Sequence, residues 1–204
     1  TKELMNALPS WTKREKKQEH VSKVLSEPIV NVNDLNISFK LKKDKIFSRR
    51  KYFKALDSVS FVLRRSSTLA VVGESGSGKT TLAKTILGLC SAEISGSVFF
   101  NDTNILNCDR KRLRKIRANL QVVFQDPISS LNPRMRVGEI IEEGIKIHQP
   151  SLVKKDIDKK IKSILNDVGL SSDCVYRFPH EFSGGQRQRI CIARALAVLS
   201  LIHI

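Results

Sequence analysis

A chain of 204 residues with 41% apolar residues can bury one sizeable core, and its formal net charge of +16 calls for a polyanionic neighbour such as a nucleotide, anionic lipid headgroups or nucleic acid. The four cysteines form no C-x-x-C pair and the four histidines show no ligand spacing, so the sequence predicts neither a disulfide framework nor a metal cluster. The longest apolar run, 190–204, is short for a membrane span and contains Arg194, so neither a span nor a signal peptide is predicted.

The N-terminal part of the chain precedes the first large domain, which we expect to start near Pro28. Residues 1–27 carry few apolar residues and no glycine. They predict the end of a helix, stopped by Pro9 and followed by a solvated linker. Alternating apolar residues then predict one or two strands over 28–40 and a further strand over 55–63.

A basic stretch, KKDKIFSRRKYFK at 42–54, lies between these strands. A solvated loop is the favoured interpretation. Its aromatic residues Phe47, Tyr52 and Phe53 keep a binding patch open as the alternative, because basic and aromatic residues together can stack on bases or sit at a membrane surface.

The stretch VVGESGSGKTTL at 71–82 fits the phosphate-binding pattern G-x-x-x-x-G-K-[ST]. The apolar residues 69–72 predict a buried strand before the loop, and 80–88 predict a helix after it, with Gly88 as its C-cap. A glycine turn without a ligand is the alternative, but it leaves the flanking strand and helix unexplained.

The loop has residues suited to a nucleoside triphosphate. Gly73, Gly76 and Gly78 can take positive φ, so that successive N–H groups turn inward as an anion-binding concavity at a helix N-terminus. Lys79 would supply an ammonium for the β- and γ-phosphates, and Thr80 a hydroxyl for Mg²⁺. The amide of Thr81 would contact the α-phosphate.

The segments after the loop contain apolar runs and amphipathic stretches. We expect strands at 96–100 and 120–124, a short basic helix at 109–118, and amphipathic helices at 137–148 and 151–168. The architecture is therefore a strand-rich core with a helical insertion.

A second anion site is predicted in EFSGGQRQRICIARALAV at 181–198. Ser183 can cap the following helix, and Gly184 and Gly185 leave its N-terminal amides uncovered. Taken alone this pattern is weak, because a capped helix with two glycines is common. Together with the loop at Gly73 it becomes informative.

These residues resemble the ATP-binding subunits of ABC transporters. Four elements occur in the family's order: the Walker A loop GESGSGKT, the Q-loop VVFQDP, the signature FSGGQ and the helix RQRICIARAL. The segments QVVFQDPISSLNPR and HEFSGGQRQR are similar to the oligopeptide and dipeptide importer branch. The resemblance covers about 28–198, and its one noted departure is Phe182 where the family usually has Leu.

The resemblance implies an α/β P-loop NTPase fold, with an ABC-type core of a mixed sheet and flanking helices. It places one ABC ATP-binding domain at 28–204, with a helical subdomain at about 126–182. The leader TKELMNALP is similar to the closing tail of such a domain. Residues 1–27 would then be the tail of a preceding ATPase domain plus a linker, as in the fused microcin C and peptide importer ATPases, with a chance helix end as the alternative.

The resemblance also implies a site for ATP and Mg²⁺, shared head to tail by two domains. Thr80 and Gln125 would coordinate Mg²⁺, and Lys79 and Gln125 would serve catalysis. Phe39 would stack on adenine, with Tyr52 as its competitor. The phosphates would be held by Gly73, Glu74, Ser75, Gly76, Ser77, Gly78, Lys79, Thr80 and Thr81 of one domain and by Ser183, Gly184, Gly185 and Gln186 of its partner.

The family's hydrolytic Asp-Glu pair and switch histidine do not occur in this sequence. By family spacing the pair should fall beyond Ile204, and His203 stands too early to be the switch residue. The last six residues, LSLIHI, resemble a translated sequencing-adapter tail, so we expect the native sequence to differ after Val198. We therefore expect weak nucleotide binding and negligible hydrolysis from this polypeptide, and an active ATPase from the full-length product.

The resemblance implies import of peptides or peptide-like solutes at the cytoplasmic face of a bacterial inner membrane. The partners would be a second ABC ATPase domain, two membrane permeases that dock on the helical subdomain and, indirectly, a periplasmic solute-binding protein, with no nucleic acid. One alternative is a soluble ABC-type ATPase acting on ribosomes or nucleic acid, which the +16 charge raises. Another is a P-loop protein of a different branch, which leaves FSGGQRQR unexplained.

Overall fold

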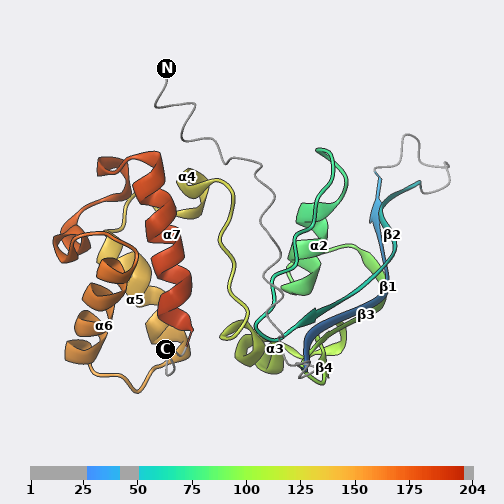
Figure 1. Cartoon of the computed structure of the whole chain (residues 1–204), viewed down its shortest axis with the longest axis horizontal. Helices are drawn as coiled ribbons and strands as arrows, with labels where there is room; N and C mark the ends of the chain where they lie inside the picture. Colours follow the sequence, from blue (N-terminus) through green and yellow to red (C-terminus); the bar gives the residue numbers. More distant parts are fainter. Residues whose placement is uncertain (1–26, 42–50, 200–204) are drawn as a thin grey trace, which may run out of the picture.

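The computed structural model describes residues 27–41 and 51–199, which form a sheet unit and a helical unit side by side (Figure 1). The sheet unit comprises 27–41 and 51–120, and the helical unit comprises 126–199. The predictions made for 1–26, 42–50 and 200–204 lie outside the described residues.

The strands of the sheet unit form one antiparallel sheet in the order β2-β1-β3-β4. They are β1 (Pro28–Lys40), β2 (Tyr52–Arg64), β3 (Glu93–Phe100) and β4 (Thr103–Asn104). The strands predicted at 28–40, 55–63 and 96–100 are confirmed. The first is a single strand rather than two, because it pairs along its length with β2 on one side and β3 on the other.

Strand β1 changes face in the middle. Its buried residues are Val30 and Val32 before the change and Leu35 and Ile37 after it, so the alternation slips by one residue where the pairing register shifts. Gly96 of β3 permits this irregularity. It has φ +93, and a Cβ there would lie 2.3 Å from the carbonyl oxygen of Asp34.

Helix α2 (Lys79–Ile86) packs on the sheet, and the basic helix α3 (Arg110–Arg117) follows a short 3₁₀ turn, η1 (Ile105–Asn107). The predicted helix end at Gly88 is confirmed as a Schellman motif. Gly88 has φ +63. Its N–H donates to the carbonyl oxygen of Thr85 at 2.9 Å, and the N–H of Leu89 donates to the carbonyl oxygen of Lys84 at 2.8 Å.

The helical unit has its own hydrophobic core, which shares no buried residue with that of the sheet unit. Its elements are α4 (Pro127–Ser130), α5 (Val137–His148), α6 (Lys154–Asp167), η2 (Ser172–Tyr176), η3 (Pro179–Glu181) and α7 (Gly184–Val198). The predicted helices at 137–148 and 151–168 are confirmed, the second starting three residues late. Apolar faces of α5, α6 and α7 meet in this core.

The buried strands predicted at 69–72 and 120–124 are wrong for this structure. Neither segment is a strand, and Val72 is 93% exposed and Phe124 is 38% exposed. A strand forms only when a neighbour accepts and donates its backbone hydrogen bonds. Within 27–41 and 51–199 no segment pairs with either run, so both lack regular secondary structure despite their apolar composition.

The four cysteines are free thiols, and two of them, Cys174 and Cys191, are buried in the helical core. Across the part of the chain that the structure describes, no helix is both long enough and apolar enough to cross a bilayer.

Candidate nucleotide-binding site

The phosphate loop runs from Gly73 to Gly78 and leads directly into α2. Gly76 and Gly78 have φ of +84 and +90, which a side chain would strain. At Gly78 a Cβ would also lie 2.7 Å from the carbonyl oxygen of Ala55 and 2.6 Å from a methyl carbon of Leu56, whereas at Gly76 nothing lies within 4 Å. The loop therefore packs tightly on β2 at one end and stays open at its middle.

The ammonium of Lys79 lies against this loop. Its Nζ donates to the carbonyl oxygens of Gly73 at 2.8 Å and Glu74 at 2.6 Å, and it lies 3.2 Å from the hydroxyl of Ser77. Because these acceptors are neutral, they hold the cation in place without cancelling its charge. It can therefore still attract an anion that enters the loop.

The first turn of α2 offers unpaired donors beside that cation. Gly78 is the N-cap and provides no side-chain cap, and the first turn has no acidic residue. Among the described residues, the amides of Lys79, Thr80 and Thr81 have no acceptor, because the first helical bond is donated by Leu82 to Gly78. These groups form the anion-binding end of a helix. The predicted residues Gly73, Glu74, Ser75, Gly76 and Ser77 are all exposed beside it.

A cleft of about 770 Å³ separates α2 from the helical unit. Its walls include Lys79 and Thr80 from α2, Gln125 from the connecting segment, and Arg194 from α7. The structure thus brings together Thr80 and Gln125, which lie far apart in the sequence. Their hydroxyl and amide oxygens are hard donors of the kind that Mg²⁺ prefers.

Sequence reasoning did not assign Asp126, although it also lines the cleft next to Gln125. Its carboxylate caps α4, with Oδ1 accepting from the amide of Ile128 at 2.9 Å. Hydrogen bonds from the Ser129 side chain and from that amide hold the pKa of Asp126 below its ordinary value. The aspartate after the glutamine in VVFQDP was the available signal.

The second predicted anion site is the N-terminus of α7. Ser183 Oγ accepts from the amide of Gln186 at 3.3 Å, and Gln186 Oε1 accepts from the amide of Ser183 at 3.0 Å, which forms a capping box. In the described chain the amides of Gly184 and Gly185 have no acceptor, and a Cβ at either glycine would meet nothing within 4 Å. Two backbone donors are therefore presented to solvent.

Phe182, the residue before the N-cap Ser183, anchors the start of α7 in the helical core. Phe182 is 3% exposed in the helical core, and the guanidinium of Arg177 lies 4.5 Å from its ring centroid. Phenylalanine thus fills the place where the family usually has Leu without exposing apolar surface. In Figure 1, the N-terminus of α7 and the loop above α2 lie at the same end of the molecule but on different units. No hydrogen bond or ion pair joins the two loops within the described ranges.

The two aromatic candidates for an adenine contact lie on opposite faces of the sheet. Phe39 follows buried Ile37 by two residues and packs against the core of the sheet unit, and its cross-strand partner Phe53 is 55% exposed. Tyr52 pairs with Lys40 on the other face and is 47% exposed. Leu56, which packs against the end of the phosphate loop at Gly78, pairs with Ile37 on the core face.

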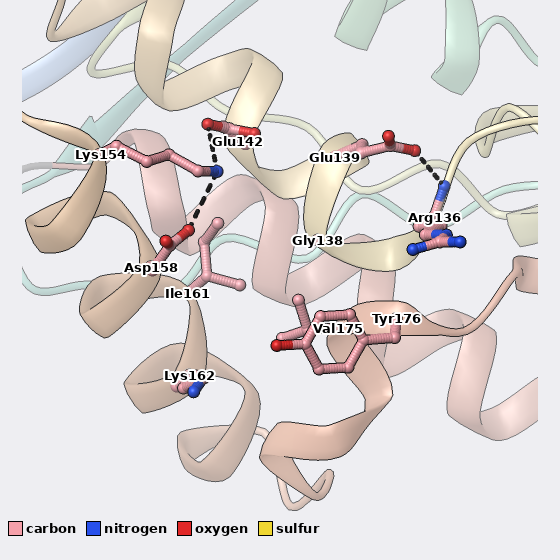
Figure 2. Close-up of a pocket in the computed structure, with 10 residues that line it drawn as sticks. All are labelled: Arg136, Gly138, Glu139, Glu142, Lys154, Asp158, Ile161, Lys162, Val175 and Tyr176. Carbon is pink, nitrogen blue, oxygen red and sulfur yellow. Dashed lines mark hydrogen bonds and ion pairs between the residues drawn. The ribbon is translucent and has the colours of Figure 1, made fainter.

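A separate pocket of about 270 Å³ lies in the helical unit, where α5, α6 and η2 meet (Figure 2). We call it the helical pocket. Its lining combines apolar groups with charges of both signs. The lining residues are Arg136, Gly138, Glu139, Glu142, Lys154, Asp158, Ile161, Lys162, Val175 and Tyr176.

One carboxylate of the helical pocket, Glu142, is nearly buried and pairs with two lysines. Glu142 Oε1 accepts from Lys154 at 2.8 Å and Lys146 at 3.0 Å, and Lys154 also bonds Asp158 at 3.0 Å. The hydrogen bond from Lys154 lowers the pKa of Glu142, and the same bond raises the pKa of Lys154. Tyr176 is 64% exposed at the rim, so an apolar ring remains available to a partner.

Comparisons with known proteins agree with this geometry. Residues 56–204 match the family described as ABC transporter. The chain is 45% identical over 174 residues to the oligopeptide transport ATP-binding protein OppF of Haemophilus influenzae, covering 84% of this chain and 52% of the relative. It is 43% identical over 175 residues to the uncharacterized ABC transporter ATP-binding protein YejF of Escherichia coli, covering 84% of this chain and 33% of the relative.

Among solved structures, an ATP-binding cassette in a dimeric post-hydrolysis state, bound to ADP and Pi, aligns with a TM-score of 0.67 at 25% identity. The alignment covers 83% of this chain and 69% of that one. The chain thus spans about half the length of the OppF relative and a third of YejF.

Proposed function

The chain belongs to the ABC transporter family, and we propose that it is the ATP-binding part of a bacterial importer of peptides or peptide-like solutes. ATP hydrolysis would drive the import at the cytoplasmic face of the inner membrane. The observation that carries this proposal is the pairing of an open, cation-bearing phosphate loop with a second exposed helix N-terminus in one chain. The relative named for oligopeptide transport supplies the substrate class.

In this function, each part of the phosphate loop has a separate task. The unpaired amides of Lys79, Thr80 and Thr81 would bind phosphate oxygens, and the Lys79 ammonium would neutralise the β- and γ-phosphates. Thr80 and Gln125, on the walls of one cleft, would hold Mg²⁺, which contributes positive charge at the γ-phosphate when bound. Gln125 also connects the sheet unit to the helical unit, so it can report the state of the nucleotide to the docking surface.

A second ATPase domain would complete the site. Ser183, Gly184, Gly185 and Gln186 of one domain would meet the γ-phosphate held by the loop of the other. The exposed amides of Gly184 and Gly185 support this arrangement, as does the dimeric state of the matched cassette. The chain matches a third of YejF, a length that leaves room for a second domain in the same native chain.

The face of the sheet favours Phe39 over Tyr52 for stacking on adenine. Phe39 lies on the core face, on which the phosphate loop packs, whereas Tyr52 lies on the other face. A base attached to phosphates in this loop would meet Phe39 first. Substituting Phe39 with Ala should therefore weaken nucleotide binding more than substituting Tyr52.

The helical pocket would receive a segment from a membrane permease, one of two permeases in the assembly, which a periplasmic solute-binding protein would serve indirectly. Its apolar floor and mixed charges suit an amphipathic helix with a polar rim. Tyr176→Ala should reduce co-purification of the full-length protein with its permeases. Val153→Ala is the matched control, because Val153 is similarly exposed but does not line the pocket.

Nucleotide binding is the first test of the proposal. A titration of the purified chain with a fluorescent ATP analogue should give a dissociation constant that rises about 10–100-fold in Lys79→Ala, the loss expected for a charge-assisted contact. Lys159→Ala, on the exposed side of α6, removes the same charge elsewhere and should bind like the wild type. Equal affinities for all three proteins would overturn the site.

Two further measurements test the dimer and the transport role. Cysteines introduced at Ser75 and, in a second copy, at Gly185 should crosslink only when ATP is present; Gly185 has space for the added side chain. In cells, the full-length protein should support growth on peptides as the amino-acid source, and its Lys79→Ala variant should not. Peptide uptake that is independent of the protein would refute the substrate class.

A further inference from the structure

Helix α3 has an unusually cationic sequence, RKRLRKIR, in which only Leu113 and Ile116 are not basic. These two residues attach it to the sheet unit, since Ile116 is buried and Leu113 packs against the core. Arg117 strengthens the attachment by donating to the carbonyls of Leu87 at 3.2 Å and Gly88 at 2.8 Å. The inner side of the helix is thus fixed.

The outer side carries charge that the described part of the chain does not neutralise. We call it the basic face; it comprises Arg110, Lys111, Arg112, Arg114 and Lys115, all exposed. Arg110, Lys111 and Lys115 have no hydrogen bond or ion pair among the described residues. Arg112 and Arg114 donate only to neutral acceptors, the hydroxyl of Thr103 at 3.0 Å and the carbonyl of Ile147 at 3.2 Å.

The carboxylate that lines a cleft with the basic face, Asp109, serves a structural purpose. Asp109 is the N-cap of α3, and its Oδ1 accepts from the amide of Arg112 at 2.6 Å. It lines a shallow cleft of about 310 Å³ together with Lys111, Arg112 and Lys115. An anion that entered this cleft would therefore meet three cations.

The chemistry of the face restricts its partner. No aromatic or exposed apolar side chain interrupts it, so it offers neither a group to stack on unpaired bases nor one to insert into hydrocarbon. The same face of a second copy would place identical cations against it, so a symmetric contact between two basic faces is repulsive. The partner that fits this face is therefore an extended anionic surface, because binding to it requires only charge complementarity.

The position of α3 favours a membrane surface. Figure 1 shows α3 at the end of the molecule away from the loop above α2 and the N-terminus of α7, so a second ATPase domain at those loops leaves it uncovered. Through the bond from Arg114 to Ile147, α3 contacts the last turn of α5, whose first half lines the helical pocket. This step rests on the proposed function, in which that pocket faces a permease.

We propose that the basic face of α3 binds the anionic headgroups of a phospholipid bilayer and so holds the ATPase against the membrane beside its permease. Each basic residue near an anionic surface contributes about a fivefold gain in partitioning. Binding should be reversible and should weaken as salt screens it.

Vesicle sedimentation tests this inference on the whole chain without nucleotide or permease, so its result is independent of the proposed function. The protein should bind vesicles that contain phosphatidylglycerol, at low salt, and not vesicles of phosphatidylcholine alone. The variant Lys111→Gln/Lys115→Gln should lower the partition coefficient about 25-fold. Glutamine keeps the helix propensity of lysine, and circular dichroism checks that the fold is retained.

The matched control is Lys155→Gln/Lys159→Gln, which removes two exposed lysines at the same spacing on α6. It should bind vesicles like the wild type. The inference is overturned if the two double variants lose binding equally, if neither loses it, or if the wild type ignores phosphatidylglycerol. Binding to duplex DNA that depends on Lys111 and Lys115, without binding to vesicles, would also overturn it and assign the face to nucleic acid.

Discussion

Substitution of Gly78 by alanine should destabilise the protein far more than the same change at Gly76. Both glycines have left-handed backbone angles, so each alanine incurs about 1–2 kcal/mol of backbone strain. Only at Gly78 does the new Cβ meet other atoms, at 2.7 Å from the Ala55 carbonyl oxygen and 2.6 Å from a Leu56 methyl. That overpacking adds about 1–3 kcal/mol. The expected losses are about 2–5 kcal/mol for Gly78→Ala and 1–2 kcal/mol for Gly76→Ala.

Urea unfolding followed by circular dichroism measures the difference. With a slope of about 2 kcal/mol per molar urea, the midpoint should fall by about 1–2.5 M in Gly78→Ala and by less than about 1 M in Gly76→Ala. Gly76→Ala should still weaken nucleotide binding, because its Cβ would project into the open middle of the loop. Equal midpoints for the two variants would refute the contact of the loop with β2.

Three further outcomes follow from the contacts described above. The pKa of Glu142 is lower in the folded protein than its ordinary value of 4.5, mainly because Lys154 donates a hydrogen bond to its carboxylate. The ion pairs therefore contribute their full stability when the pH is above about 4.5, and this contribution is lost as the pH falls through the folded-state pKa. The gap in urea midpoint between the wild type and Glu142→Gln should therefore shrink on acidification, and a constant gap would contradict the pairing with Lys154. Ser183→Ala should lower the free energy of unfolding by about 1 kcal/mol through loss of the α7 cap, measured by the same assay, whereas an unchanged value would show that the cap is dispensable. Phosphate release by this 204-residue polypeptide should be negligible, because Asp126, the one carboxylate among the described residues that line the cleft, is engaged as the N-cap of α4; sustained release that depends on Lys79 would contradict this.

Local sequence signals determined much of this protein. Gly76 and Gly78 of the phosphate loop and Gly88 at the end of α2 have the predicted positive φ, whereas Gly73 does not, and Ser183 caps α7 with its side chain as predicted. These features could be placed because each depends on contacts within a few residues. The same local order of motifs gave the ABC-type fold, which the family match and the aligned cassette confirm.

Contacts between distant segments were decided only by the tertiary structure. The apolar runs 69–72 and 120–124 have strand composition, yet a strand also needs a hydrogen-bonded neighbour, which composition cannot supply. The meeting of Thr80 with Gln125 in one cleft depends on how the sheet and helical units are placed, and the face on which Phe39 lies depends on the register of β1. Sequence therefore fixes which groups this protein presents, because caps and turns are local, whereas the fold fixes which of them meet, because pairing and packing join residues that the chain keeps far apart.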